Sequence, residues 1–148
     1  MSLINQKLEK ILTDWMKTLS FDYDISFYSG VDVGDPGNEP IMGLPRCVIS
    51  CPSATERIKD TGTFDIDLEL MISHSADDST RLEHSETCSA IVSEITSPVN
   101  IISLNQTVDF YIYDIFPQSN SFSPEDRKWV SSIAFQVVGL AQNGFVAP

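Results

Sequence analysis

The sequence has few basic residues. Nine lysines and arginines stand against 21 aspartates and glutamates, so the formal net charge is -12. The imbalance is strongest between Thr61 and Asp126, where twelve residues are acidic and one, Arg81, is basic. Proteins that hold the phosphate backbone of nucleic acids need clustered Lys and Arg side chains, which release counterions on binding. The sequence has no such cluster, and we therefore expect no attraction to DNA or RNA.

Long apolar runs are also missing. No stretch approaches the ~20 apolar residues that a membrane-spanning helix needs. Charged residues interrupt the N-terminal sequence MSLINQKLEKILTDW, where a secretory signal would have an unbroken apolar core. We expect a protein without membrane spans that stays in the cytoplasm of the cell that makes it. Its 148 residues, 42% of them hydrophobic, suit one folded domain, residues 1–148.

Cysteine and histidine are scarce. The three cysteines, Cys47, Cys51 and Cys88, are an odd number, which in a cytoplasmic chain indicates reduced thiols. The segment from Cys47 to Cys51 suggests a short strand, in which their Cα atoms lie ~13 Å apart, and a disulfide spans less than about 7 Å. With His74 and His84 these two cysteines could supply a zinc site, but neither His-x₃₋₅-His nor Cys-x₂-Cys spacing occurs. We expect no bound metal.

The common enzyme fingerprints are absent: there is no Gly-x-Gly-x-x-Gly, no Gly-Lys-Ser/Thr of a P-loop and no Gly-x-Ser-x-Gly. A catalytic interpretation would combine a histidine base, a carboxylate that orients it and a nucleophile. The candidates in one short stretch are His74, His84, Asp77, Asp78, Ser75 and Cys88. In the structural alternative, residues 77–79 cap a helix, Cys88 fills its buried face and His84 lies near the edge of that face. We favour this alternative, and expect no enzyme activity and no cofactor.

Two segments have helical periodicity. Residues 3–19 carry apolar residues at spacings of three and four behind Ser2, a suitable N-cap. A capping-box pattern at residues 80–83 predicts a second helix that runs to about Ile95 and is ended by Pro98. The predicted apolar stripe of this second helix consists of Leu82, Cys88, Ile91, Val92 and Ile95.

Alternating segments predict strands. Residues 23–28 and 108–113 alternate, the latter extending toward Phe116, and residues 64–73 give the clearest strand pattern of the chain. Residues 99–104 stay unassigned, and residues 117–126 are expected to form a polar loop. Residues 128–140 fit either helical or strand spacing, and β-branched and aromatic residues favour a strand. These elements predict an α+β fold, with a mixed or antiparallel sheet packed by two main helices.

Two surface features are candidates for function. Asp65, Asp67 and Glu69 share one face of the predicted strand 64–73, ~7 Å apart, too far to chelate one ion but close enough to repel one another. The row is either a solvated sheet face or the border of a space where negative charge is useful, such as a DNA channel. Residues 30–44 are rich in Gly and Pro and predict a long loop. The candidate interface residues in this loop are Val33, Gly34, Asp35, Pro36, Gly37 and Asn38.

The order of elements resembles the tail-terminator, or tail-completion, neck proteins of tailed bacteriophages. The resemblance rests on the layout of an amphipathic N-terminal helix, strands, a second helix with Asp77, Asp78 and His84 near its start, and further strands. It rests above all on the stretch from Phe64 to Ile95, where an alternating strand runs into a helix.

The resemblance implies a structural virion protein, made in the host cytoplasm, that forms a homo-oligomeric ring, commonly of six subunits. The ring would cap the tail tube protein and join the tail to the head connector protein. DNA would pass without specific binding, and an acidic lumen gives its phosphates nothing to hold. Two other classes stay open: an acidic DNA mimic that inhibits a nucleic-acid-binding protein, and a small hydrolase that depends on His74 or His84.

Overall fold

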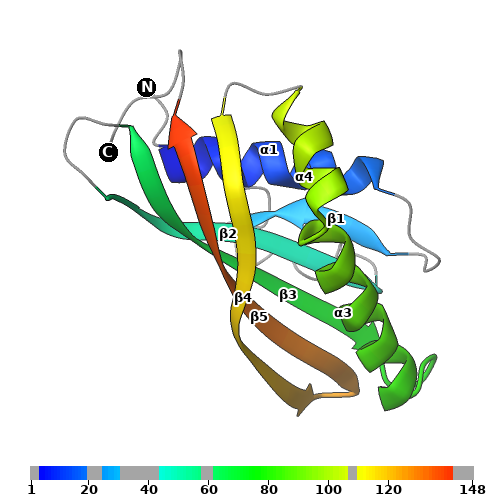
Figure 1. The fold of residues 1–148 in the computed structure, drawn as a ribbon. Helices are drawn as coiled ribbons and strands as arrows, with labels where there is room; N and C mark the ends of the chain where they lie inside the picture. Colours follow the sequence, from blue (N-terminus) through cyan, green and yellow to red (C-terminus); the bar gives the residue numbers. More distant parts are fainter. Residues whose placement is uncertain (1–3, 20–24, 31–43, 58–61, 107–109, 142–148) are drawn as a thin grey trace.

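The computed structural model describes residues 4–19, 25–30, 44–57, 62–106 and 110–141. Within them the chain forms three helices and five strands (Figure 1). The helices are α1 (Ile4–Thr18), α3 (Arg81–Ile95) and α4 (Pro98–Asn105). The strands are β1 (Ser26–Ser29), β2 (Arg46–Glu56), β3 (Thr63–Ser75), β4 (Phe110–Glu125) and β5 (Lys128–Ala141).

The five strands make one mixed sheet in the order β1-β2-β3-β5-β4. Only β1 and β2 run parallel, and the other neighbours are antiparallel. The predicted α+β fold with a mixed sheet in a single domain is therefore confirmed. Among the described helices, none has the length and apolar character needed to cross a membrane.

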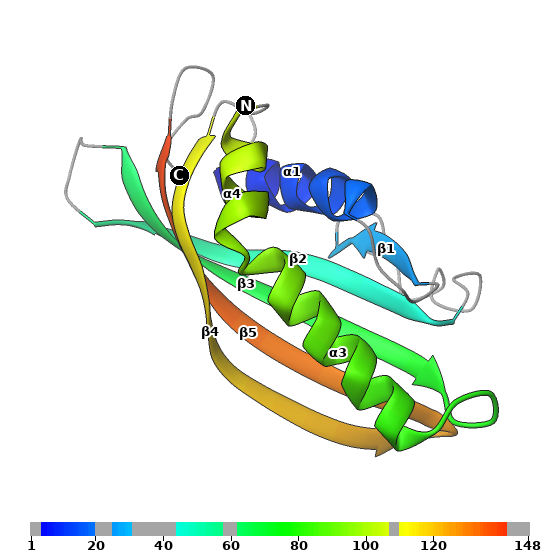
Figure 2. The ribbon, with the colours of Figure 1, turned by 45° about the vertical axis from the view of Figure 1, so that its right-hand side comes forward.

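One face of the sheet is apolar and carries the helices. On β3 the buried side chains alternate from Phe64 to Ile72, and on β5 from Ile133 to Val137. These side chains form a single cluster with the buried residues of all three helices, so the helices cover the same face. In Figure 2, α3 runs obliquely across this face and leads into α4. The opposite face, which we call the open face, carries the alternate residues of the strands.

The predicted N-terminal helix is confirmed over the residues that the structure describes. Helix α1 begins at Ile4, and its buried residues recur at helical spacing through Met16. It packs on β1 and β2. Ser2 and Tyr23, the expected cap and the expected first strand residue, lie outside the described residues.

The β4–β5 hairpin corrects one prediction. Residues 117–126 were expected to form a loop because they contain two prolines and several small polar residues, yet β4 continues to Glu125. Apart from two register shifts, β4 pairs with β5 residue by residue down to the Glu125–Lys128 pair. Prolines are tolerated on an edge strand because its outer side needs no ladder hydrogen bonds. Asp126 and Arg127 make the turn with positive φ angles of 21° and 62°. The favoured strand assignment of residues 128–140 is confirmed.

The second helix needs one correction. Leu82 was expected in the buried stripe but is 67% exposed. Cys88, Ile91 and Ile95 are buried as predicted, and Val92 packs against the same core. The further inward position is His84, one turn before Cys88. The unassigned segment after it is helix α4, with Pro98 in its first turn, where the missing N–H costs nothing.

Candidate functional site

The start of α3 is fixed by a capping box. The Thr80 hydroxyl accepts from the Glu83 backbone N–H at 3.1 Å, and the Glu83 carboxylate accepts from the Thr80 N–H at 3.0 Å. The capping box predicted at residues 80–83 is confirmed, with Thr80 as the cap, whereas the expectation that residues 77–79 cap the helix was wrong. The preceding turn is held to the hairpin, since Trp129 Nε1 donates to the Ser79 carbonyl at 3.0 Å. The first turn of α3 is thereby positioned over β3 and β5.

His84, in that first turn, points onto the sheet and meets the second histidine of the chain. Its Nδ1 lies 2.7 Å from Nδ1 of His74 on β3, and the two rings meet edge to face with centroids 4.8 Å apart. His84 is 1% exposed and His74 7%. The sequence placed His84 at the edge of the buried stripe, but it is among the most buried polar side chains of the described chain.

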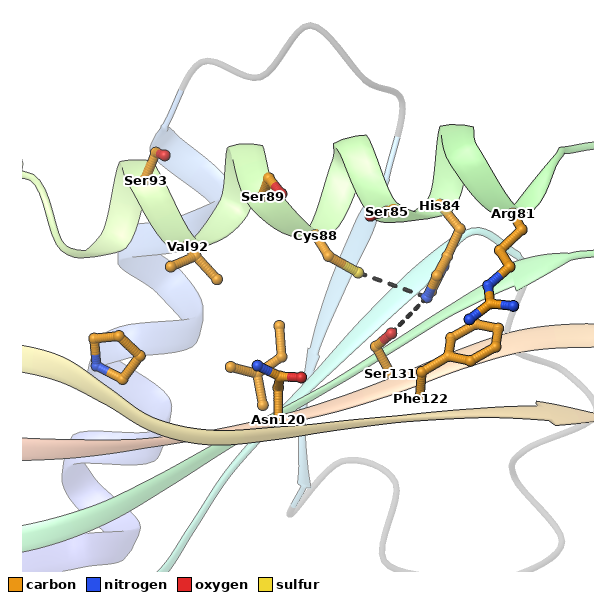
Figure 3. A pocket seen from close by; sticks show the side chains of 12 residues that line it. Arg81, His84, Ser85, Cys88, Ser89, Val92, Ser93, Asn120, Phe122 and Ser131 are labelled. Carbon is orange, nitrogen blue, oxygen red and sulfur yellow. Dashed lines mark hydrogen bonds between the residues drawn. The ribbon is translucent and has the colours of Figure 1, made fainter.

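The other nitrogen of His84 faces a hydroxyl. His84 Nε2 lies 2.7 Å from Ser131 Oγ on β5, and the Cys88 thiol lies 3.6 Å from the same nitrogen (Figure 3). Ser131 and His74 belong to the helix-covered face, because Ser131 pairs with Ile72 and His74 with Trp129. Three elements therefore build one polar cluster, Ser131, His84, His74 and Cys88, inside an apolar layer.

The proton positions in this cluster are linked. When both rings are neutral, one hydrogen lies between the facing Nδ1 atoms. If His84 donates it, His84 Nε2 is free to accept from the Ser131 hydroxyl. If His74 donates it, His84 Nε2 carries a hydrogen and donates to Ser131 Oγ instead. The tautomer of one ring therefore decides whether Ser131 faces a base or a donor.

Burial lowers the basicity of the cluster. It brings the pKa of His84 down to about 4, mainly because the imidazolium would lose its water, and secondarily because of His74. The pKa of His74 is also lowered by burial, with the Glu83 carboxylate acting in the opposite direction. Burial raises the pKa of the Cys88 thiol, which Ser131 partly offsets. At pH 7 both imidazoles and the thiol are uncharged.

A cleft of about 570 Å³ lies beside this cluster, between α3 and the β4–β5 hairpin. His84, Cys88 and Ser131 form part of its wall. At one end, the Arg81 guanidinium lies 4.2 Å above the ring of Phe122, which in turn stacks on Trp129. Figure 3 shows the side chains of α3 along one wall, facing Asn120 and Phe122 of β4 across the cleft.

His74 also lines a second, smaller cleft, of about 230 Å³, on the other side of the cluster. Asp78, Ser79 and Glu83 share its lining. The histidine pair therefore connects two clefts, with His84 on the larger one and His74 on the smaller one.

The predicted catalytic grouping is only partly assembled. His74 and His84 do come together, but the group that faces the ring nitrogen of each is the other histidine, not Asp77 or Asp78. Nothing in the sequence around Ser131 marks it, because a serine in a strand has no motif and it lies 47 residues from His84. The pairing on β5 is what brings it to the cluster.

The zinc combination weighed for the two histidines and two cysteines is not assembled. Among the described residues, no three His, Cys, Asp or Glu side chains are arranged to hold a metal ion. Cys47 and Cys51 are buried on β2 without a disulfide. Burial raises the pKa of both thiols far above the usual range, so they stay protonated.

The acidic row lies on the open face, as the alternation predicts. Asp67 is exposed, and Asp65 and Glu69 are half-buried. Asp65 forms an ion pair with Arg57, at 2.8 Å. Asp67 and Glu69 accept hydrogen bonds from the hydroxyls of Ser53 and Ser132, at 2.6 and 2.8 Å. The candidate interface loop, Val33 to Asn38, lies outside the described residues.

Comparison with the models of known protein families gave no match. A search of curated proteins likewise found no significant similarity.

Proposed function

We propose that this chain is a structural subunit of a bacteriophage tail, of the tail-terminator type. In this proposal a ring of subunits caps the end of the tail tube and joins the tail to the head connector. The observation that supports it best is the open face of the sheet. The three described helices all lie on the opposite face, so no described helix covers the five-stranded open face, which could meet a neighbour or border a channel.

The centre of the open face is small, hydroxylated and acidic. One cross-strand row runs from Ser50 through Glu69 and Ala134 to Ser119. Arg57 pairs with Asp65 on this face. The carboxylates of Asp67 and Glu69, by contrast, are held by hydroxyl groups and keep their charge. Charges of this sign repel phosphates, which suits the wall of a channel through which DNA slides.

One corner of the molecule has a different character. Tyr111, Tyr113 and Phe116 on β4 are 44%, 55% and 38% exposed, and the two tyrosine rings pack with centroids 5.2 Å apart. We call these three residues the aromatic corner. A ring needs contacts between two different surfaces of successive subunits. Exposed tyrosines on an edge strand suit such a contact, because aromatic side chains are enriched at interfaces.

Electron microscopy of the purified protein, with and without tail tubes, tests the proposal. We expect rings and capped tube ends. Replacing Tyr113→Ser and Phe116→Ser together should abolish both. The matched control is Ile102→Ser, which removes an apolar side chain that is 59% exposed on α4, and it should leave both unchanged. A strict monomer that never associates with a tube would contradict the proposal.

A second candidate function rests on the charge. The net charge of -12 and the acidic row would also suit a DNA mimic that occupies a nucleic-acid-binding protein. The assembly state separates the two proposals. The mimic is expected to be a monomer or dimer in light scattering and to bind a basic partner with an affinity that falls as salt is raised, whereas the tail subunit is expected to form rings.

A further inference from the structure

The side chains beside the larger cleft form a continuous chain of contacts that the proposed tail function does not use. Ser131 Oγ lies 2.7 Å from His84 Nε2, and His84 Nδ1 lies 2.7 Å from His74 Nδ1. The chain begins at a half-buried hydroxyl on the cleft wall and ends at a buried imidazole. Nucleophilic catalysis requires this order of groups: a hydroxyl, a base within hydrogen-bond reach, and a third group that orients the base.

We propose that Ser131 and His84 form an acyl-transfer site that cleaves activated esters or thioesters, with His74 as a positioning residue. This activity is separate from the proposed tail function, and either can fail without the other. When the Nδ1–H of His84 points at His74, the lone pair of His84 Nε2 faces Ser131. This tautomer of His84 is the one that the reaction needs.

The reaction balances without any further reagent. Ser131 Oγ attacks the acyl carbon while its proton moves to His84 Nε2, and the bond to the leaving alcohol or thiol breaks as that group takes the proton from His84. Water then attacks the acyl-serine by the same route and releases the carboxylic acid. The donors that line the cleft, the Asn120 amide and the Arg81 guanidinium, are the candidates to stabilise the oxyanion.

The electrostatics select the substrate class. Because burial disfavours the imidazolium form, His84 is neutral at pH 7 but a weak base. Such a base suffices when the leaving group needs little protonation to depart. Aryl esters and thioesters have leaving groups of this kind, whereas amides do not. The cleft of about 570 Å³ suits a small acyl group, and Val92, Pro117 and Ile133 give part of its lining an apolar character.

Labelling with a fluorophosphonate probe at pH 7.5, followed by peptide mass mapping, tests the site, because this probe reacts with activated serines. We expect one adduct, on Ser131. Ser131→Ala should abolish it, and His84→Gln, of similar size, should slow it by about 100-fold. The matched control is Ser93→Ala, in the same cleft but not bonded to His84, and it should label at the wild-type rate.

His74 is tested by rescue. His74→Asn keeps an oxygen that can accept from His84 Nδ1 and should retain labelling to within about threefold, whereas His74→Leu should lose about tenfold or more. The folded protein should also hydrolyse p-nitrophenyl acetate with a burst that Ser131→Ala lacks, and should leave p-nitroacetanilide intact. The proposal is overturned by the absence of an adduct on folded wild-type protein, by equal labelling of Ser131 and Ser93, or by unchanged Ser131 labelling in folded His84→Gln.

Discussion

Lowering the pH from 7.5 to 4 is expected to destabilise the fold through His84. An exposed histidine in the unfolded chain has a pKa of about 6.5, whereas burial lowers that of His84 to about 4. Between these values the unfolded state takes up a proton that the folded state excludes. Stability is therefore unaffected above pH 7.5 and falls as the pH drops through this window.

The magnitude follows from the size of the shift. A pKa of about 6.5 in the unfolded state and about 4 in the folded state lowers the unfolding free energy by about 3 kcal/mol when the pH reaches 4. Domains of this size are stable by roughly 5 to 15 kcal/mol, so this loss is a large fraction of the total. The groups that face His84 act in the same direction or are neutral: His74 on β3 has a lowered pKa of its own, and Cys88 and Ser131 are uncharged.

Urea unfolding followed by tryptophan fluorescence, repeated from pH 7.5 to pH 4, measures this effect. His84→Gln removes the titration, so its unfolding free energy should fall by about 3 kcal/mol less than that of the wild type over the same range. Carboxylates that titrate near pH 4 contribute to both proteins and cancel in the difference. Parallel curves for the two proteins would refute the burial of a neutral His84.

Three further outcomes test the cap, the core and the open face. Thr80→Ala removes a capping hydroxyl and should lower the unfolding free energy by about 1 kcal/mol, measured by urea unfolding at pH 7.5. Leu70→Ala, in the fully buried core, should lower the unfolding free energy by about 2 to 5 kcal/mol. Leu82→Ala, on the exposed side of α3, should lower it by less than about 0.5 kcal/mol, and equal losses would contradict the burial of Leu70 and the exposure of Leu82. Asp67→Lys with Glu69→Lys should leave the fold intact and make the protein retain DNA in a salt-dependent shift assay, and no retention would count against the open face as a surface that repels phosphates.

The elements with a strong period were predictable from the sequence, and those that depend on a distant partner were not. The alternation of apolar residues in β3 and their helical spacing in α1 each indicate one buried face, and both predictions are confirmed. Residues 117–126 have the composition of a loop, and only their pairing with β5 makes them a strand. Leu82 is outside the interval of four and three residues that joins His84, Cys88 and Ile91, so its side chain faces away from the core although leucine is usually buried.

The candidate site was predictable in its histidines but not in its arrangement. His74 and His84 stood out because the chain has no other histidines. Their direct contact depends on the turn between β3 and α3. The contact with Ser131 depends on β5, in which Ser131 lies 47 residues after His84. The larger cleft depends on the same hairpin, so the sequence contains no local signal for it.

The two prolines of β4 have a consequence for how this molecule behaves at high concentration. Proline has no N–H to donate, and the pairing with β5 has register shifts between Ile112 and Asp114 and between Pro117 and Ser119, so β4 is an irregular edge strand. The described part of β1, at the other edge, is four residues long. Neither edge is a good template for strand addition. Copies of this protein are therefore expected to join through side chains, as closed and reversible assemblies. They should resist growth into cross-β fibres even though none of the described helices covers the open face.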